Sequence, residues 1–324
     1  MLAKPMWRSP AFWKSYEKNT WRMTTMRESM AGSSLKYRIQ KNREKRAGQF
    51  AEEILEAAGL LSLPVDPLAL AATEAPRLKV AGGDFKDHFD GLLEYHPKKN
   101  KFFLLYNTKY DRPFEDHRPR TRFSIAHELG HFYLEHHRAF LLLDGRSHYS
   151  SGEFAVDDRI EREADAFAAS LLMPKALIHP LVNQGELTPE RIKAIKEQCH
   201  TSLTSMAIRS VSCSDYPCDI VAIQNGRVAW RFPSEALIEG KCYPLDKKEA
   251  LRSKNAQRAW QAFKKEESVE EYGEGPKTDW FRSYGPASRS IIVSEHYMPI
   301  PPMNMLLVLL TISEEDLAGF QDEI

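Results

Sequence analysis

The pentapeptide His127-Glu128-Leu129-Gly130-His131 constrains this chain more than any other part of its sequence. An α-helix turns about 100° per residue, so His127 and His131 would lie one turn apart on the same face. Both imidazoles can then reach a single ion, while Glu128 projects beside it. Two histidines and a carboxylate in this order are typical of a zinc site that activates water. We therefore expect a helix around residue 127 that carries a metal ion.

A catalytic zinc takes three protein ligands and keeps a fourth position for water, so the pentapeptide predicts a third donor. His137 is one candidate. Leu134, however, stands where the chain would need glycine to turn back toward the ion, and on a continuing helix His137 lies roughly 80° from the ligand face. In that arrangement His136 and His137 would form a solvated helix end.

Glu161 is the second candidate, and the local pattern favours it. It belongs to a further amphipathic segment, with Asp165 one turn later on the same face and Glu163 pointing elsewhere. Glu161 can therefore bind the metal while Asp165 accepts a hydrogen bond from a ligand histidine and fixes its tautomer. Ile160, Ala164, Phe167 and Leu171 make this segment amphipathic. The small residues Ala164 and Ala168 permit close approach to the first helix.

Two stretches around these residues resemble the ImmA/IrrE family of metallopeptidases. They run from Arg120 to His131 and from Glu161 to Pro174. Pro64-Val65-Asp66-Pro67 after a helix, and a strand that ends in Asn107, are also similar to the family pattern. The resemblance covers about residues 48–180.

The resemblance implies a zincin-like fold in which zinc is held by His127, His131 and Glu161, with Glu128 as the catalytic carboxylate. Asp165 stands where many relatives carry Asn. Such enzymes typically cleave a helix-turn-helix repressor and so release genes for stress responses or mobile-element transfer. Longer relatives carry a helix-turn-helix-like segment and then a GAF-like sensory module, which residues 187–213 and 214–324 resemble.

The periodicity of apolar residues predicts an α+β fold with a small antiparallel sheet, the helices that carry the chemistry, a helix-turn-helix-like segment and a C-terminal α/β module. The resemblance implies that the sheet and these helices form a zincin-like domain. The expected parts are a basic, disordered arm at 1–47, the peptidase domain at 48–186, the helix-turn-helix-like segment at 187–213 and the regulatory module at 214–324. In the module we expect strands at 219–224, 227–232, 290–294 and 305–312, a helix near 250–263 and a charged loop at 266–275.

Charge separates the arm from the rest. The chain has 45 Lys and Arg against 45 Asp and Glu, but residues 1–50 hold 12 of the basic and 3 of the acidic residues. A basic arm of this kind suits weak contact with nucleic acid or a transit peptide as well as a plain leader. No apolar run is long enough for a membrane span or a signal peptide, so we expect a cytoplasmic protein.

The four cysteines lack a paired CxxC, and we expect reduced thiols. An irregular second metal site remains an alternative for four residues: Cys199, His200, Cys213 and Cys218.

Two functions of different classes compete. The first is a zinc endopeptidase that acts on a regulatory protein. The second is a DNA-binding transcriptional regulator whose metallopeptidase fold is a vestigial scaffold. Its candidate recognition helix, residues 203–211, offers only Arg209 for reading bases. A third interpretation, compatible with the first, makes residues 214–324 a sensor that gates the peptidase.

Overall fold

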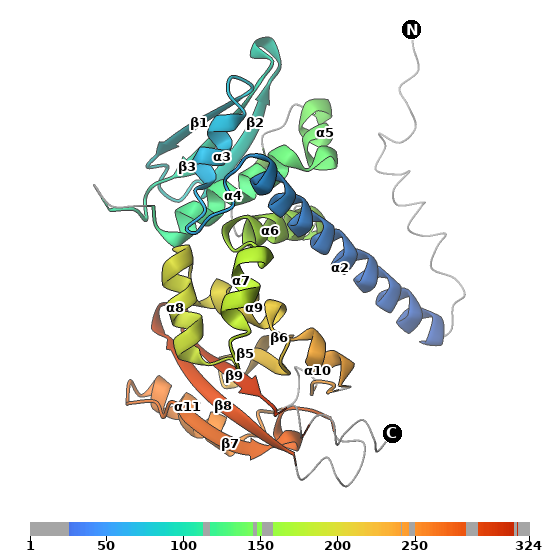
Figure 1. Cartoon of the computed structure of the whole chain (residues 1–324), viewed down its shortest axis with the longest axis vertical. Coiled ribbons are helices and arrows are strands. Elements are labelled where there is room, and N and C mark those ends of the chain that lie inside the picture. The colour runs from blue at the N-terminus through green and yellow to red at the C-terminus, as the bar shows by residue number, and fades with distance from the viewer. Residues whose placement is uncertain are drawn as a thin grey trace. The chain divides into compact units, whose positions relative to one another are not determined.

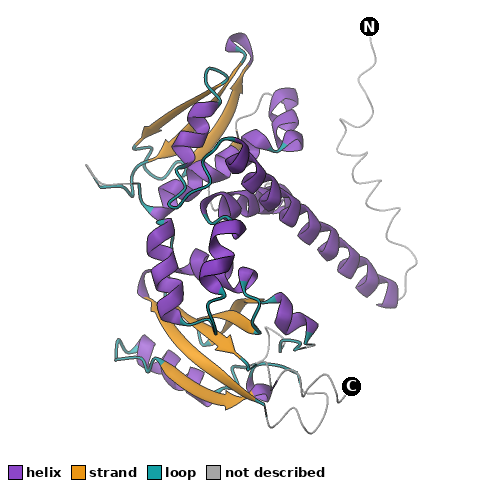
Figure 2. Ribbon diagram, viewed as in Figure 1, coloured by secondary structure: helices purple, strands orange, loops and turns teal. Residues whose placement is uncertain are grey.

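The computed structural model describes residues 26–112, 117–144, 148–150, 158–240, 242–245, 250–282, 291–313 and 316. The chain divides into two compact units, Met1–Arg46 and Ala47–Ile324. Helices and two β-sheets make a mixed α+β architecture, consistent with a zincin-like domain (Figure 2). Among the described residues no helix has the length and apolar character needed to cross a membrane.

The first helix, α2, begins much earlier than expected, because it spans Met26–Ala57. Residues 26–47 of the arm that was expected to be disordered are thus helical in the structure, and residues 1–25 lie outside the described part of the chain. This segment is rich in Lys, Arg, Glu, Met and Ala, which are strong helix formers. Charged side chains one turn apart add support, as in the Lys41–Glu44 pair at 2.7 Å.

The first sheet contains β1 (Leu78–Gly83), β2 (Gly91–His96), β3 (Lys101–Asn107) and β4 (His148–Ser150), in the order β1-β3-β2-β4. Strand β2 runs antiparallel to β3 and β4, as expected, but β1 pairs with β3 in parallel. The expected antiparallel sheet is thus a mixed one. The chain reverses twice between β1 and β3, and β3 then inserts between β1 and β2.

Alternation along β3 gives this sheet one buried and one open face. Phe102 and Leu104 are buried in the core, and the Phe102 ring meets Phe132 of the helix below at 5.3 Å between centroids. Lys101 and Phe103 point to the other face. The buried face therefore supports the helix that carries the pentapeptide (Figure 1).

That helix, α4 (Pro119–Tyr133), packs closely against α6 (Asp158–Leu172). At the end of α4 the backbone of Leu134 is extended, with φ −69° and ψ 113°, so the chain turns and a separate helix, α5 (Glu135–Asp144), follows. Short helices α3 (Pro67–Thr73) and α7 (Lys175–Val182) complete this region.

The two helices expected near residues 187–213 are present as α8 (Pro189–Cys199) and α9 (Leu203–Cys213). Thr188 caps α8 by accepting a hydrogen bond from Arg191 N, and His200 turns the chain in the left-handed region with φ 52°. Helix α9 packs on strands of the second sheet through a buried apolar face. A helix pair of this size is common, so its identity as a helix-turn-helix stays a prediction.

The second sheet is antiparallel throughout its described residues, in the order β6-β5-β9-β8-β7. Its strands are β5 (Cys218–Gln224), β6 (Arg227–Pro233), β7 (Tyr272–Pro276), β8 (Ile292–Ile300) and β9 (Met305–Thr311). Helices α10 (Glu235–Glu239) and α11 (Lys254–Lys264) accompany it. Strand β7 begins inside the segment 266–275, which was expected to be a charged loop, and ends one residue after it. The GAF-like character of this module remains a prediction.

Candidate metal centre

The start of α4 is held in place by the loop before it. Arg118, at the N-cap, has no side-chain cap of its own, and Asp111 substitutes by accepting hydrogen bonds from Arg118 N at 2.8 Å and Thr121 Oγ1 at 2.9 Å. One turn later, Arg122 donates to the carbonyl oxygen of Val65 at 2.5 Å. These contacts fix the helix on the segment Pro64–Pro67 and so set the position of the pentapeptide.

The two helices bring the predicted ligands together. Nε2 of His127 lies 3.0 Å from Nε2 of His131 and 3.3 Å from Oε2 of Glu161. Nε2 of His131 lies 3.8 Å from Oε1 of Glu161. Both histidines are buried, while the Glu161 side chain is 27% exposed, so the group opens to solvent on the α6 side.

These separations are near those of a tetrahedral zinc site, in which ligand atoms lie about 3.3–3.4 Å from one another. His127 Nε2 is 3.0 Å from His131 Nε2 and 3.3 Å from Glu161 Oε2. One donor atom of each of the three residues lies within 4.8 Å of the others. Two imidazole nitrogens and one carboxylate oxygen are also a donor set that zinc prefers. The residues present therefore fit the metal that the sequence pattern implies.

Asp165 stands behind the first histidine. Its Oδ1 lies 2.9 Å from Nδ1 of His127, on the side of the ring away from Glu161. A carboxylate there keeps the proton of the imidazole on Nδ1 and leaves the lone pair of Nε2 for a metal. The position expected for Asp165 is thus the one that the structure gives it, although its side chain is 55% exposed.

The carboxylates also change the protonation of His127. Burial alone would lower its pKa, but hydrogen bonds to Asp165 and Glu161, together with the negative charge of the fully buried Glu128, raise the pKa to about 10. In the metal-free protein this imidazole therefore carries a proton at neutral pH. A metal ion would have to displace that proton.

His137 does not behave as the sequence suggested. It is buried rather than solvated, and its Nδ1 lies 3.1 Å from Nδ1 of His131, on the far side of that ring from Glu161. The expectation assumed a continuous helix, whereas the turn at Leu134 swings His137 back toward α4. His137 supports a ligand histidine from behind instead of joining the group of three.

Glu163 points away from the metal group, as expected, and contacts two other histidines. Its Oε2 lies 2.6 Å from Nε2 of His136 and 3.5 Å from Nε2 of His137, and its side chain is buried. The adjacent histidines and the glutamate were a visible signal in the sequence, but the turn that brings them together could not be predicted from it. The four cysteines are free and buried, and no metal-holding group among the described residues includes them.

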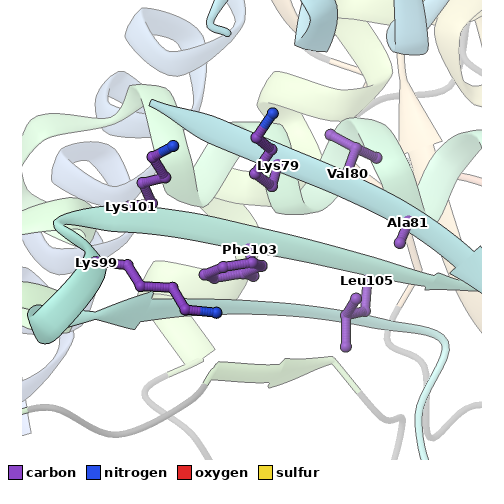
Figure 3. Close-up of a pocket in the computed structure, with 7 residues that line it drawn as sticks. All are labelled: Lys79, Val80, Ala81, Lys99, Lys101, Phe103 and Leu105. Carbon is purple, nitrogen blue, oxygen red and sulfur yellow. The ribbon is translucent and has the colours of Figure 1, made fainter. Parts of the chain in front are cut away.

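A surface hollow of about 410 Å³ lies elsewhere, on the open face of the first sheet (Figure 3). Alternation along β3 separates it from the core that supports α4. Lysine and apolar side chains line it, without a histidine or an acidic group: Lys79, Val80, Ala81, Lys99, Lys101, Phe103 and Leu105. The chemistry of the metal centre therefore does not involve it.

Part of the chain is similar to a known peptidase domain. Residues 115–210 match the profile of the IrrE N-terminal-like domain, peptidase family M78. A solved structure of a Mycobacterium tuberculosis transcriptional regulator is similar over 82% of this chain and 75% of that one, at 13% sequence identity and a TM-score of 0.49. A comparison with curated proteins finds no match.

Proposed function

We propose that this chain, which carries a domain of the ImmA/IrrE family at residues 115–210, is a zinc-dependent endopeptidase. One observation carries the proposal: His127, His131 and Glu161, from two helices of that domain, converge so that one donor atom of each lies within 4.8 Å of the others, a spacing that a single metal ion can bridge. Two histidines and a glutamate are one of the ligand sets of catalytic zinc, and Glu128, a carboxylate, follows the first ligand in the same helix.

Bound zinc would lower the pKa of water toward about 7 and polarise the carbonyl of the scissile peptide bond. Glu128 then accepts the proton of the attacking water and delivers it to the leaving amine. Glu128 is fully buried and follows the first ligand, His127, in the same helix. Asp165 and His137 hold the two ligand rings in the orientation that directs Nε2 to the metal.

The substrate that we propose is a regulatory protein, namely a helix-turn-helix transcriptional repressor whose cleavage changes the expression of stress-response or mobile-element genes. Support comes from the family resemblance of residues 48–180. The test is to incubate the zinc-loaded chain with a small repressor encoded in an adjacent reading frame and to identify fragments by mass spectrometry. Intact repressor after incubation with fully zinc-loaded protein would contradict this substrate.

The competing proposal is a DNA-binding regulator with a vestigial peptidase fold, favoured by the basic N-terminal residues. Arg209, the cation expected to read bases, is engaged within the protein: it donates to Glu52 Oε1 at 2.9 Å and to Met173 O at 2.8 Å. This weakens the case for α9 as a recognition helix. Salt-dependent DNA binding that is lost when residues 1–47 are deleted, without cleavage of any partner, would favour this alternative.

A further inference from the structure

A second group of metal-binding side chains lies next to the first. His136 and His137 at the start of α5 converge on Glu163 of α6, and each residue offers one donor atom. His137 and Glu163 are buried, whereas the His136 side chain is 49% exposed. None of these three residues belongs to the group of His127, His131 and Glu161.

We propose that His136, His137 and Glu163 form a second site for a divalent zinc-type cation, here called the outer site. Two imidazole nitrogens and a carboxylate oxygen are the same donor classes that suit zinc in the first, inner site. Nε2 of His136 and Nε2 of His137 lie 2.6 and 3.5 Å from the same Glu163 oxygen, so shifts of about 1 Å reach the 3.3–3.4 Å spacing of a tetrahedral ion. The exposed edge of His136 gives an ion and its water ligands access from solvent.

The contact between His137 and His131 couples the two sites. When an ion occupies the inner site on Nε2 of His131, the neutral ring keeps its proton on Nδ1 and donates it to Nδ1 of His137, 3.1 Å away. His137 then carries its own proton on Nε2, facing Glu163. An outer ion needs the lone pair on Nε2 of His137, so the proton of that ring would have to move to Nδ1. The Nδ1–H groups of His131 and His137 would then point at each other, and the hydrogen bond between them would be lost.

The two ions therefore oppose each other. Loss of this hydrogen bond in a buried position lowers the affinity for the outer ion by roughly tenfold or more when the inner ion is present. The effect is reciprocal, so the outer ion weakens inner binding by the same factor. The outer site would fill only when zinc is in excess, and it would then make the inner ion easier to lose.

Zinc titration of the full chain by equilibrium dialysis tests the proposal, with a readout that does not depend on peptidase activity. The wild type is expected to bind one ion tightly and a second one more weakly. His136→Gln should bind only the tight one. The matched control is His179→Gln, another partly exposed histidine paired with a carboxylate, Asp215, away from both groups; it should bind two. One ion in the wild type, or two in His136→Gln, would overturn the outer site.

Glu161→Gln disables the inner site and tests the coupling. We expect a single ion with an affinity roughly tenfold or more above that of the second ion in the wild type. If the outer site of Glu161→Gln bound zinc with the same affinity as the second ion of the wild type, the proposed coupling would be overturned. Because these measurements count ions, a chain that binds two ions but cleaves nothing would refute the proposed peptidase and leave the outer site standing.

Discussion

Gly130 of α4 lies directly against Ala164 of α6. A Cβ atom built on Gly130 would stand 3.2 Å from the Cα of Ala164 and 3.2 Å from the Cβ of Phe167. Glu161 is the residue one turn before Ala164 on the same helix. The absence of a side chain at Gly130 is thus what allows α6 to approach α4 and bring the Glu161 carboxylate to the two histidines.

Gly130→Ala should therefore lower zinc affinity while leaving α4 helical. The methyl group forces α4 and α6 apart by a few tenths of an ångström, although Ala is the better helix former by about 1 kcal/mol. Metal–ligand distances stay within about 0.2 Å of their preferred values, so a shift of this size strains the site. We expect zinc affinity to fall roughly tenfold in a competition assay.

Gly48→Ala is the matched control. A Cβ atom built on Gly48 of α2 would lie 2.5 Å from the hydroxyl oxygen of Ser170, which belongs to α6, and this hydroxyl can rotate away. An unchanged affinity in Gly130→Ala would mean that helix separation does not limit the site.

Glu128→Gln should abolish peptide hydrolysis without removing the metal. The amide cannot accept a proton from the attacking water, and general-base catalysis of this kind contributes roughly 10²–10⁴-fold to the rate. Zinc content measured by atomic absorption should stay at the wild-type level, because the ligand atoms belong to His127, His131 and Glu161. Hydrolysis by this variant at the wild-type rate would remove Glu128 from the mechanism.

Asp165 should act through the ring of His127. Asp165→Ala removes the acceptor that lies 2.9 Å from Nδ1, and losing such a partner typically costs 10- to 100-fold in metal affinity. Asp165→Asn keeps an oxygen that can accept the same hydrogen bond, so its affinity should lie much closer to the wild type. The comparison is made by competition with a zinc chelator; equal losses in both variants would indicate a structural effect instead of tautomer control.

Zinc binding should depend on pH over an unusually wide range. In the metal-free protein the pKa of His127 is about 10, so the ion displaces one proton at any pH below this value. The apparent affinity should then rise by about tenfold per pH unit from 6.5 to 8.5. If His127 had an ordinary pKa near 6.5, the apparent zinc affinity would stop rising and reach a plateau above about pH 7.

The hydrogen bond to Asp165 supports this raised pKa. Asp165→Ala should therefore lower the pKa of His127, so that the apparent zinc affinity reaches its plateau at a lower pH. A wild-type affinity that is flat between pH 7 and 8.5 would contradict the raised value.

The inner site was accessible to sequence analysis because its geometry is local. His127 and His131 follow from helical periodicity, and Glu161 and Asp165 from the same periodicity on a second helix. What could not be read is the end of α4: Leu134 ends the helix with an extended backbone and without glycine, so His137 reached a place that a continuing helix excludes.

Non-local pairing explains the other differences. The parallel pairing of β1 with β3 depends on where β3 inserts, and the alternating pattern of each strand is the same in either direction. Strand β7 has the sequence Tyr-Gly-Glu-Gly-Pro and lies at the edge of the sheet. Two glycines and a proline are unusual within a strand, so this sequence does not predict one. The early part of α2 consists of residues with high helix propensity but lacks a strong helical period of apolar residues, so a prediction based on that period missed it.

The last prediction concerns β9, which is buried on both faces. Leu307 and Leu309 belong to a core that continues through α9 to the peptidase helices, whereas Leu306 and Val308 belong to a second core with α11. If this shared core couples the parts, residues 47–324 unfold together, and the boundary expected at 213/214 does not separate two stability units. Zinc release then reports the unfolding of the peptidase helices, and the fluorescence of Trp230, Trp260 and Trp280 reports the unfolding of residues 214–324.

In a chain with Trp7, Trp13 and Trp21 replaced by Phe, we expect the two signals to change at the same urea concentration. Leu307→Ala should lower both midpoints, since truncating a fully buried leucine costs about 2–5 kcal/mol. Leu306→Ala, its neighbour on the opposite face, is the matched comparison and should also shift both if the unit is cooperative. Separate transitions, with Leu307→Ala moving only the tryptophan signal, would instead make residues 214–324 an independent module, because the zinc site would then be stable without the sheet beneath α9.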